Sequence, residues 1–245
     1  MTPRRTLATA GRVLTQLRHD HRTVGILLVV PCVIFGLVSW MFWDEPTPVV
    51  DTLGPVLIGI FPAIIMFLIT SVATLRERTR GTLERLMSMP ISKADFLLGY
   101  AAAFAVAAAI QALVLLAFAV WVCGMNVRGA WWLMGLVAVL SAVLGSTLGL
   151  AASAFAKTEF QAVQLMPALL LPQVIVCGLL MPRGDMPQVL EWFSRAAPFT
   201  YAAEAMQRLQ MGASTWDVAK DIGVICAFIA GTLAAGIVTL RRRSA

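Results

Sequence analysis

Charged side chains are scarce in this chain of 245 residues. Asp, Glu, Lys and Arg make up 13% of it, 59% is hydrophobic, and the mean hydropathy is +0.83. A water-soluble domain of this length needs far more polar surface around its core. The composition therefore excludes a soluble globular domain and indicates an integral membrane protein.

The residue types that carry most catalytic and metal chemistry are few. The only two histidines, His19 and His21, precede the first apolar run, which excludes a His-Glu-x-x-His zinc motif and a buried Ser–His pair. None of the three lysines follows a glycine, so the chain has no P-loop for ATP. Four cysteines lie in or at the ends of apolar runs without a Cys-x-x-Cys pair, and we interpret them as core residues. We expect no catalytic, cofactor or metal site, no nucleic-acid partner, and no enzyme activity in this chain.

Long apolar runs are what the sequence has instead. A helix needs about 20 apolar residues to cross a bilayer. Six runs are long enough and carry no Asp, Glu, Lys or Arg beyond their margins: Thr23 to Trp43, Leu53 to Leu75, Phe96 to Cys123, Trp131 to Ala156, Gln161 to Met181, and Ile222 to Leu240. They predict an all-α integral membrane fold with six transmembrane helices. The first run ends in Phe-Trp-Asp-Glu-Pro and not at a cleavage site, which favours an uncleaved span over a signal peptide.

The distribution of positive charge predicts the topology. With six spans, both termini and the second and fourth loops share one side, which holds 14 of the 19 Lys and Arg residues. The positive-inside rule then places both termini in the cytoplasm. Tryptophans near the opposite ends of the spans are typical of an interfacial belt: Trp40, Trp43, Trp131, Trp132 and Trp216.

The segment before the first span, residues 1–22, has an amphipathic pattern. Leu7, Val13 and Leu17 share one helical face, whereas Arg5 and Arg12 share the other. This pattern predicts a helix lying in the membrane interface. The alternative is a charged leader that only sets topology.

Two further patterns concern packing within or between subunits. Small residues recur every four positions in the fourth span, at Ser141, Gly145, Gly149 and Ser153. Such a stripe lets helices approach closely, either inside the bundle or at a subunit interface. In the fifth span Gln164 and Gln173 lie at membrane depth, where they need a neighbouring helix or a wet cavity.

The largest external element is the loop of residues 182–221. It predicts two short amphipathic helices, the second from near Thr200 to Gly212, which we expect to return to the membrane surface. Ser214 to Asp217 has the spacing of a capping box that begins the helix of the last span.

The loop between the second and third spans, residues 76–95, is unusually charged. After Gly81 the residues Leu83, Leu86 and Met87 form an apolar helical face, and Pro90 ends the helix. A short amphipathic helix held between two spans is suited to dock into a groove on a partner protein. The alternative is a solvated loop that only sets topology.

This loop closely resembles the cytoplasmic loop of bacterial ABC-2-type transporter permeases. Their motif approximates Glu-Arg-x-x-Gly-Thr-Leu-Glu-x-Leu-x-x-x-Pro-[Val/Ile/Leu]-Ser, and here it runs from Glu77 to Ser92. The interfacial helix, the six spans and the large loop before the last span also fit that family. Thr79 departs from the pattern, because many relatives carry a charged residue there.

The resemblance implies a single ABC-2-type transmembrane domain over residues 1–245. Its parts are an interfacial helix (1–22), two spans (23–75), a cytoplasmic coupling loop (76–95), three spans (96–181), an external helical loop (182–221), the last span (222–240) and a cytoplasmic tail (241–245). Two ATP-binding cassette subunits, which hold ATP and Mg, would dock on the coupling helix Glu77 to Met89. The docking residues would be Glu77, Arg80, Gly81, Leu83, Glu84, Leu86 and Met87.

The resemblance also implies an exporter in the bacterial cytoplasmic membrane, with a second permease copy, preferably identical, and with membrane lipid around it. The composition fits the daunorubicin-like drug-resistance branch, and the substrate would be an amphiphilic drug, a lipid or a lipid-linked glycan. Candidates for the substrate path are Phe67, Thr70, Ser71, Gln164 and Gln173. The alternatives from the residues alone are an ATP-independent secondary carrier or channel, and a non-transporting scaffold or sensor.

Overall fold

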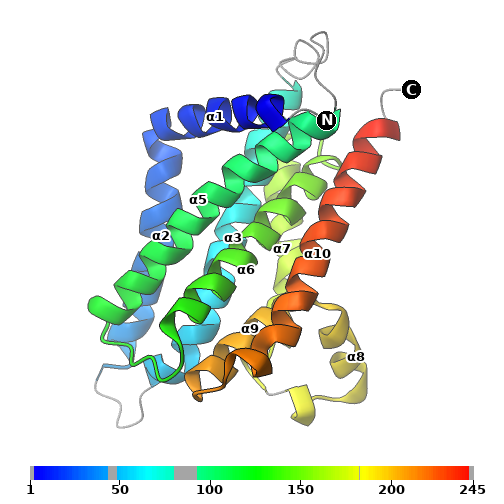
Figure 1. The fold of residues 1–245 in the computed structure, drawn as a ribbon. Helices are drawn as coiled ribbons and strands as arrows, with labels where there is room; N and C mark the ends of the chain where they lie inside the picture. The colour runs from blue at the N-terminus through cyan, green and yellow to red at the C-terminus, as the bar shows by residue number, and fades with distance from the viewer. Residues whose placement is uncertain (1–2, 44–48, 80–92, 182, 243–245) are drawn as a thin grey trace.

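A computed structural model describes residues 3–43, 49–79, 93–181 and 183–242, and Figure 1 shows its fold. The helices are α1 (Pro3–His19), α2 (His21–Met41), α3 (Val49–Thr79), α5 (Lys93–Trp121), α6 (Trp131–Ser153), α7 (Glu159–Val176), α8 (Gln188–Ala196), α9 (Pro198–Gln210) and α10 (Thr215–Arg242), with a 3₁₀ turn at Arg183–Asp185. No strand occurs within these four ranges. The predicted all-α class is confirmed.

Six of these helices are long and apolar enough to cross a membrane: α2, α3, α5, α6, α7 and α10. They coincide with the six predicted spans, so the chain is a multi-pass membrane protein. Several helix boundaries differ from the predicted ones by a few residues, and the end of the fifth span has a clear physical cause. The fifth span was expected to reach Met181, but α7 ends at Val176 because Gly178 takes a positive φ of 95°, a conformation that glycine adopts at helix ends.

Helix α3 lies in the centre of the bundle and packs closely against α6. A Cβ placed on Gly145 would come within 2.1 Å of the Ala63 carbonyl oxygen, and one on Gly149 within 2.5 Å of the Phe67 carbonyl oxygen. The Ser141 hydroxyl donates to the Gly59 carbonyl oxygen across the same seam. The small-residue stripe therefore packs inside the bundle, which was one of its two predicted uses.

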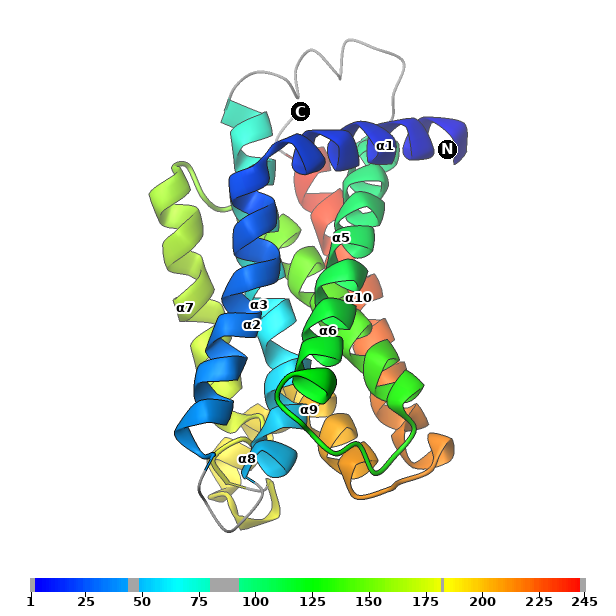
Figure 2. The same ribbon diagram turned by 90° about the vertical axis from the view of Figure 1, so that its left-hand side faces the viewer.

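The helix predicted before the first span is confirmed as α1, which lies across one end of the bundle (Figure 2). Ala10 and Val13 are buried, whereas Leu7, assigned to the same apolar face, is exposed. A Cβ on Gly99 of α5 would meet the Thr9 Cβ at 2.6 Å, so α1 packs tightly on α5. We call this end the terminal end, because α1, the C-terminal ends of α3 and α10 and the N-terminal ends of α5 and α7 meet there. The other end is the distal end.

The two helices predicted in the large loop are α8 and α9, but only α8 has the surface position that was expected. Phe199, Met206 and Leu209 of α9 are fully buried, and α9 packs against α3, α6 and α10. Alanines at 202, 203 and 205 leave room for this close approach. Beyond α9, Gly212 has a φ of 85°, and the Asp217 carboxylate accepts from Ser214 N at 2.8 Å, which confirms the predicted cap of α10.

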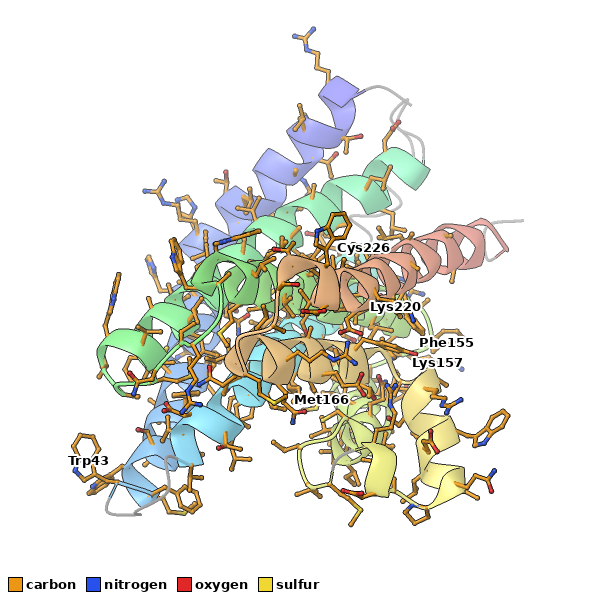
Figure 3. The ribbon with its side chains drawn as sticks, turned by 60° about the horizontal axis from the view of Figure 1, so that its bottom comes forward. Trp43, Phe155, Lys157, Met166, Lys220 and Cys226 are labelled. Carbon is orange, nitrogen blue, oxygen red and sulfur yellow. The ribbon has the colours of Figure 1, made fainter. Side chains whose placement is uncertain are left out.

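Tryptophans mark the distal end of the bundle. The side chains of Trp40, Trp43, Trp131, Trp132 and Trp216 are all exposed, and Trp43 points away from the helices in Figure 3. Their amphipathic rings suit a membrane–water interface.

Candidate functional site at the terminal end

The last turn of α3 is joined to two other helices by its arginines. Arg76 forms a bidentate pair with Glu159, the first residue of α7, with Nε to Oε1 and Nη2 to Oε2 both at 2.8 Å. Such parallel bonds fix both distance and orientation. Two residues further on, the Arg78 guanidinium donates to the carbonyl oxygen of Ser153 at the end of α6. The end of α3 is thus connected to α6 and α7 at once.

A third connection runs from the same turn to α1. Arg12 of α1 donates to the Tyr100 hydroxyl at 2.9 Å, and its guanidinium carbon lies 5.9 Å from the centre of that ring. Its Nη1 is 3.9 Å from Glu77 Oε1, at the outer limit of an ion pair. Glu77 Oε2 is buried and has no hydrogen-bond partner within the described part of the chain.

Asp20 fixes the corner between α1 and α2. Its carboxylate accepts from Thr23 N at 3.1 Å and from the Thr23 hydroxyl at 2.6 Å, which makes it the N-cap of α2. These bonds to the ionised form hold the pKa of Asp20 below its ordinary value of 3.8. The corner is therefore set by a charged cap at neutral pH.

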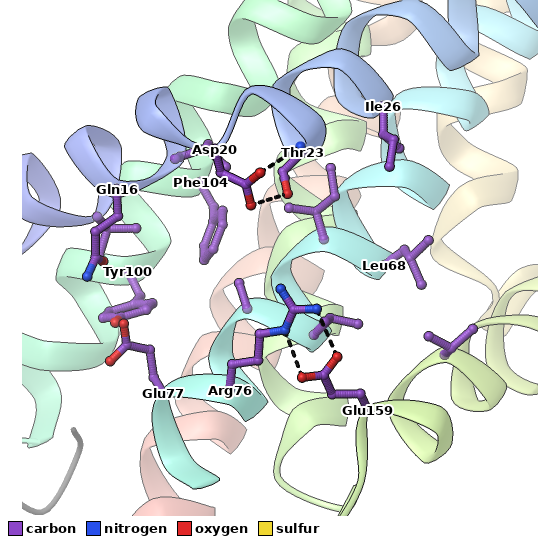
Figure 4. A pocket seen from close by; sticks show the side chains of 16 residues that line it. Gln16, Asp20, Thr23, Ile26, Leu68, Arg76, Glu77, Tyr100, Phe104 and Glu159 are labelled. Carbon is purple, nitrogen blue, oxygen red and sulfur yellow. Dashed lines mark hydrogen bonds and ion pairs between the residues drawn. The ribbon is translucent and has the colours of Figure 1, made fainter. Parts of the chain in front are cut away.

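A cavity of about 600 Å³ lies among these contacts (Figure 4). Its polar lining includes Asp20, Arg76, Glu77 and Glu159, which come from the α1–α2 corner, α3 and α7. Gln16 and Thr23 also line it. The rest of its wall is apolar or aromatic and is contributed by Val13, Leu17, Ile26, Leu68, Ile69, Val72, Ala73, Tyr100, Phe104 and Val163. A space of this size and character suits a drug-sized amphiphile.

Of the predicted docking residues, Glu77 lies within the described part of the chain. Glu77 lies in the last turns of α3. Arg80, Gly81, Leu83, Glu84, Leu86 and Met87 lie outside the described residues, as does Ser92 of the expected second capping box. Their assignment stays a prediction.

The structure does not gather the predicted path residues into one place. Phe67, Thr70 and Ser71 are fully buried in α3, and the two hydroxyl oxygens have no hydrogen-bond partner among the described residues. On α7, Gln164 is exposed, whereas the Gln173 amide donates to the Leu169 carbonyl oxygen of its own helix at 2.8 Å. Their role in a path also stays a prediction.

Several contacts at the terminal end were missed by the sequence reasoning. Asp20, three residues before the Thr23 that begins an apolar run, is a recognisable cap signal. Arg76 and Glu159, by contrast, are 83 positions apart. No local pattern connects such a pair.

A second set of ion pairs lies near the distal end. Glu204 of α9 meets Arg183 at 3.0 Å and Arg208 at 3.4 Å, and Arg208 also pairs with Asp221 of α10 at 2.8 Å. Asp221 and Glu204 are far less exposed than Glu159. This chain of charges ties α9 to α10 and to the start of the large loop.

Comparison with known proteins identifies the family. The model of the ABC-2 type transporter family matches residues 6–211, which extend from α1 to just beyond α9. The chain belongs to the ABC-2 type transporter family. All the terminal-end contacts described above lie inside the matched region, so this family assignment includes the cavity.

Similar curated proteins include two from Escherichia coli and one from Dictyostelium discoideum. The chain is 28% identical to the probable multidrug ABC transporter permease YbhR over 60% of its own length and 40% of that protein. It is 27% identical to the probable multidrug ABC transporter permease YbhS over 70% of its length and 46% of that protein. It is 28% identical to ABC transporter G family member 20 over 66% of its length and 22% of that protein. The chain therefore aligns with less than half of each of these ABC-2 relatives.

Proposed function

We propose that this chain is the transmembrane permease subunit of an ATP-driven exporter that moves an amphiphile out of the cytoplasm or the inner leaflet. Two separate ATP-binding cassette subunits would supply the ATPase and hold ATP and Mg. The family match and the names of the E. coli relatives, both multidrug permeases, support this function. Drugs, lipids and lipid-linked glycans all belong to the proposed substrate class.

The observation that carries the proposal is the connectivity of the last turn of α3. This 31-residue helix leads directly into the segment that resembles a coupling helix. Arg76, Glu77 and Arg78 link its end to α7, α1 and α6. A partner that displaces residues 80–92 would therefore move several transmembrane helices together, since a rigid helix transmits displacement along its axis.

Charge supports a cytoplasmic location for the terminal end, in a bacterial cytoplasmic membrane. The segments at that end carry most of the Lys and Arg residues, as the positive-inside rule requires for cytoplasmic loops. The cytoplasm is also where ATP is available to a partner subunit.

An exposed polar group on α7 supports a second permease copy. Gln164 is exposed among apolar neighbours, and Phe160 and Val163 beside it are exposed too. A glutamine facing lipid is costly unless another helix covers it. An identical copy packed on α7 would cover it and would enclose a path between α3 and α7.

The test is to co-express the chain with candidate ATP-binding cassette subunits from the same organism, purify the complex and reconstitute it in vesicles. We expect the two proteins to copurify and efflux of an amphiphilic dye to require ATP hydrolysis. Efflux should persist when the proton gradient is collapsed. Transport that ignores ATP and stops with the gradient would instead establish a secondary carrier.

A further inference from the structure

The charge of the terminal-end cavity is unbalanced. Its lining includes three carboxylates, from Asp20, Glu77 and Glu159, but only one guanidinium, from Arg76. Arg12 adds a second positive charge beside Glu77, at 3.9 Å from its carboxylate. Even with Arg12 included, the described residues around this space carry three negative charges and two positive charges.

The carboxylates differ in how fully they are already used. Glu159 accepts two hydrogen bonds from Arg76, and Asp20 accepts two from Thr23. Glu77 has one cation at 3.9 Å, from Arg12, and the Tyr100 hydroxyl beside it, and its buried Oε2 has no hydrogen-bond partner within the described residues. A buried carboxylate oxygen without a partner is costly, so a cation placed beside Glu77 would be stabilised.

The walls of the cavity suit an apolar body attached to that cation. Leu68, Ile69 and Val72 line it along α3, and Val163 lines it from α7. The rings of Tyr100 and Phe104, with centroids 6.1 Å apart, form another part of the wall. Both rings are only 1% exposed and Arg12 already lies over the Tyr100 ring, so they contribute apolar contact to this wall.

We propose that this cavity binds organic monocations with a large apolar body, and that Glu77 is the carboxylate that selects them. The inference rests on the proposed exporter function and gives its substrate class. The cationic centre would lie near Glu77 Oε2, with the apolar body against the α3 wall. The occupant would then sit beside the contacts that join the last turn of α3 to α1 and α7. It could arrive from the cytoplasm or from the inner leaflet, since the same chemistry recognises it in both cases.

The test compares two ions of nearly the same size and shape but opposite charge, tetraphenylphosphonium and tetraphenylborate. Each is dialysed to equilibrium against the full chain in lipid nanodiscs, with empty nanodiscs as the blank for partition into lipid. We expect saturable binding of tetraphenylphosphonium only. Saturable binding of tetraphenylborate with equal or higher affinity would overturn the proposal.

Two substitutions in the cavity should act in opposite directions. Glu77→Gln should weaken tetraphenylphosphonium binding by about tenfold, because it removes the selecting charge at close range. Arg76→Gln should strengthen it several-fold, because it removes a positive charge from the cavity lining. A misfolded variant loses binding and cannot gain it, so the Arg76→Gln result does not depend on how Glu77→Gln folds.

Two further variants locate the effect. Glu191→Gln removes a carboxylate on α8, outside the cavity, and should leave binding unchanged. Ala73→Trp should abolish binding by filling the cavity, provided that the melting temperature shows a folded protein. Unchanged binding in a folded Ala73→Trp and in Glu77→Gln would place the cation elsewhere and overturn the proposal. ATP-driven transport of other amphiphiles in the complex would survive that result, so failure of this inference is distinct from failure of the proposed function.

Discussion

The two sides of α3 are built in contrasting ways. Toward α6, glycines bring the two backbones into direct contact, and the Ser141 hydroxyl bonds to the α3 backbone. Toward α7, the terminal half has a cavity of about 600 Å³ and a solvent-exposed ion pair between Arg76 and Glu159. Direct backbone contact leaves no room for adjustment, whereas an exposed ion pair can open and close at small cost.

This contrast indicates that α3 can be held rigidly against α6 while its interface with α7 rearranges. We expect α3 and α6 to move as one body, since their packed interface has no alternative arrangement. We expect α7 to change position relative to that body, with the terminal-end cavity changing volume as it does. The predictions below test each side of α3 in turn, beginning with the largest effect.

The largest effect should come from breaking the α3–α6 interface. Gly145→Ala places a Cβ where the Ala63 carbonyl oxygen stands, 2.1 Å away, so the helices must separate. We expect a loss of about 3 kcal/mol or more in the free energy of unfolding and a melting temperature lower by roughly 10 °C. The loss of stability is measured by thermal unfolding in detergent, with size-exclusion chromatography as the readout of folded protein. Gly231→Ala is the matched control, because nothing lies within 4 Å of a Cβ at that position of α10. Equal stability of the two variants would contradict the close packing.

The next effect concerns the segment that we propose drives α3. Leu86→Asp removes the apolar face predicted to dock on the ATPase subunit, and Glu84→Ala removes a flanking charge. We expect transport to fall by about tenfold or more, the scale of a broken coupling between two sites, while the amount of protein in the membrane stays the same. Vesicle efflux and ATPase rates of the complex measure it. Normal transport in both variants would show that the coupling-helix assignment is wrong.

A smaller effect should follow from opening the α3–α7 ion pair. Arg76→Ala or Glu159→Ala should change stability by no more than about 1 kcal/mol, because the pair is exposed. Transport per ATP should nevertheless fall, since the link from the end of α3 to α7 is lost. The double variant with Arg76→Glu and Glu159→Arg should recover part of it.

The control for that experiment uses an Arg–Glu ion pair that lies within a single helix and does not join two helices. Arg195 and Glu191 pair at 2.6 Å within α8, so Arg195→Ala removes an arginine without separating two long helices. It should leave transport per ATP unchanged. If Arg195→Ala and Arg76→Ala reduce transport equally, the α3–α7 pair has no special part in coupling.

The smallest effect concerns the corner that borders the cavity. Asp20→Ala removes the cap of α2 and should cost about 1 kcal/mol at neutral pH. Because the folded-state pKa of Asp20 is lowered, this stabilisation is complete above the ordinary carboxyl value of 3.8 and disappears as the pH falls through the lower folded-state value. Melting temperatures at pH 7 and under acid conditions measure the difference. Asp20→Asn keeps a capping oxygen without the charge, so its stability relative to Asp20→Ala should not vary with pH.

Much of the fold could be predicted from the sequence, because each span is a local property. Apolar run length defined all six membrane helices, and four-residue spacing of small side chains predicted the seam on α6. The predicted surface position of α9 was wrong. Its Ala-rich sequence is equally compatible with a surface helix and with a buried one. Only the neighbouring helices decide between them.

The candidate site was harder to predict because its contacts, like the burial of α9, depend on which helices become neighbours. Glu77 was expected to act in docking, and its neighbourhood with Arg12 and Tyr100 arises from α1 folding across α5. The pair of Arg76 and Glu159 depends on the relative placement of α3 and α7. Contacts between residues that are far apart in sequence follow from tertiary packing, which no local pattern encodes.

The burial of α9 has a consequence for how the protein is assembled during synthesis. The partners of α9 in α3 and α6 are complete once residue 153 has been made, but α9 itself ends only at Gln210. A Cβ on Gly129 would lie 2.1 Å from the Leu209 carbonyl oxygen, so the turn before α6 must already leave space for a helix made some 80 residues later. Until α9 has been made, the surfaces of α3 and α6 that it covers stay exposed at the distal end of the nascent bundle. A ribosome-bound intermediate that stops before α9 should therefore be the form most exposed to membrane quality-control proteases.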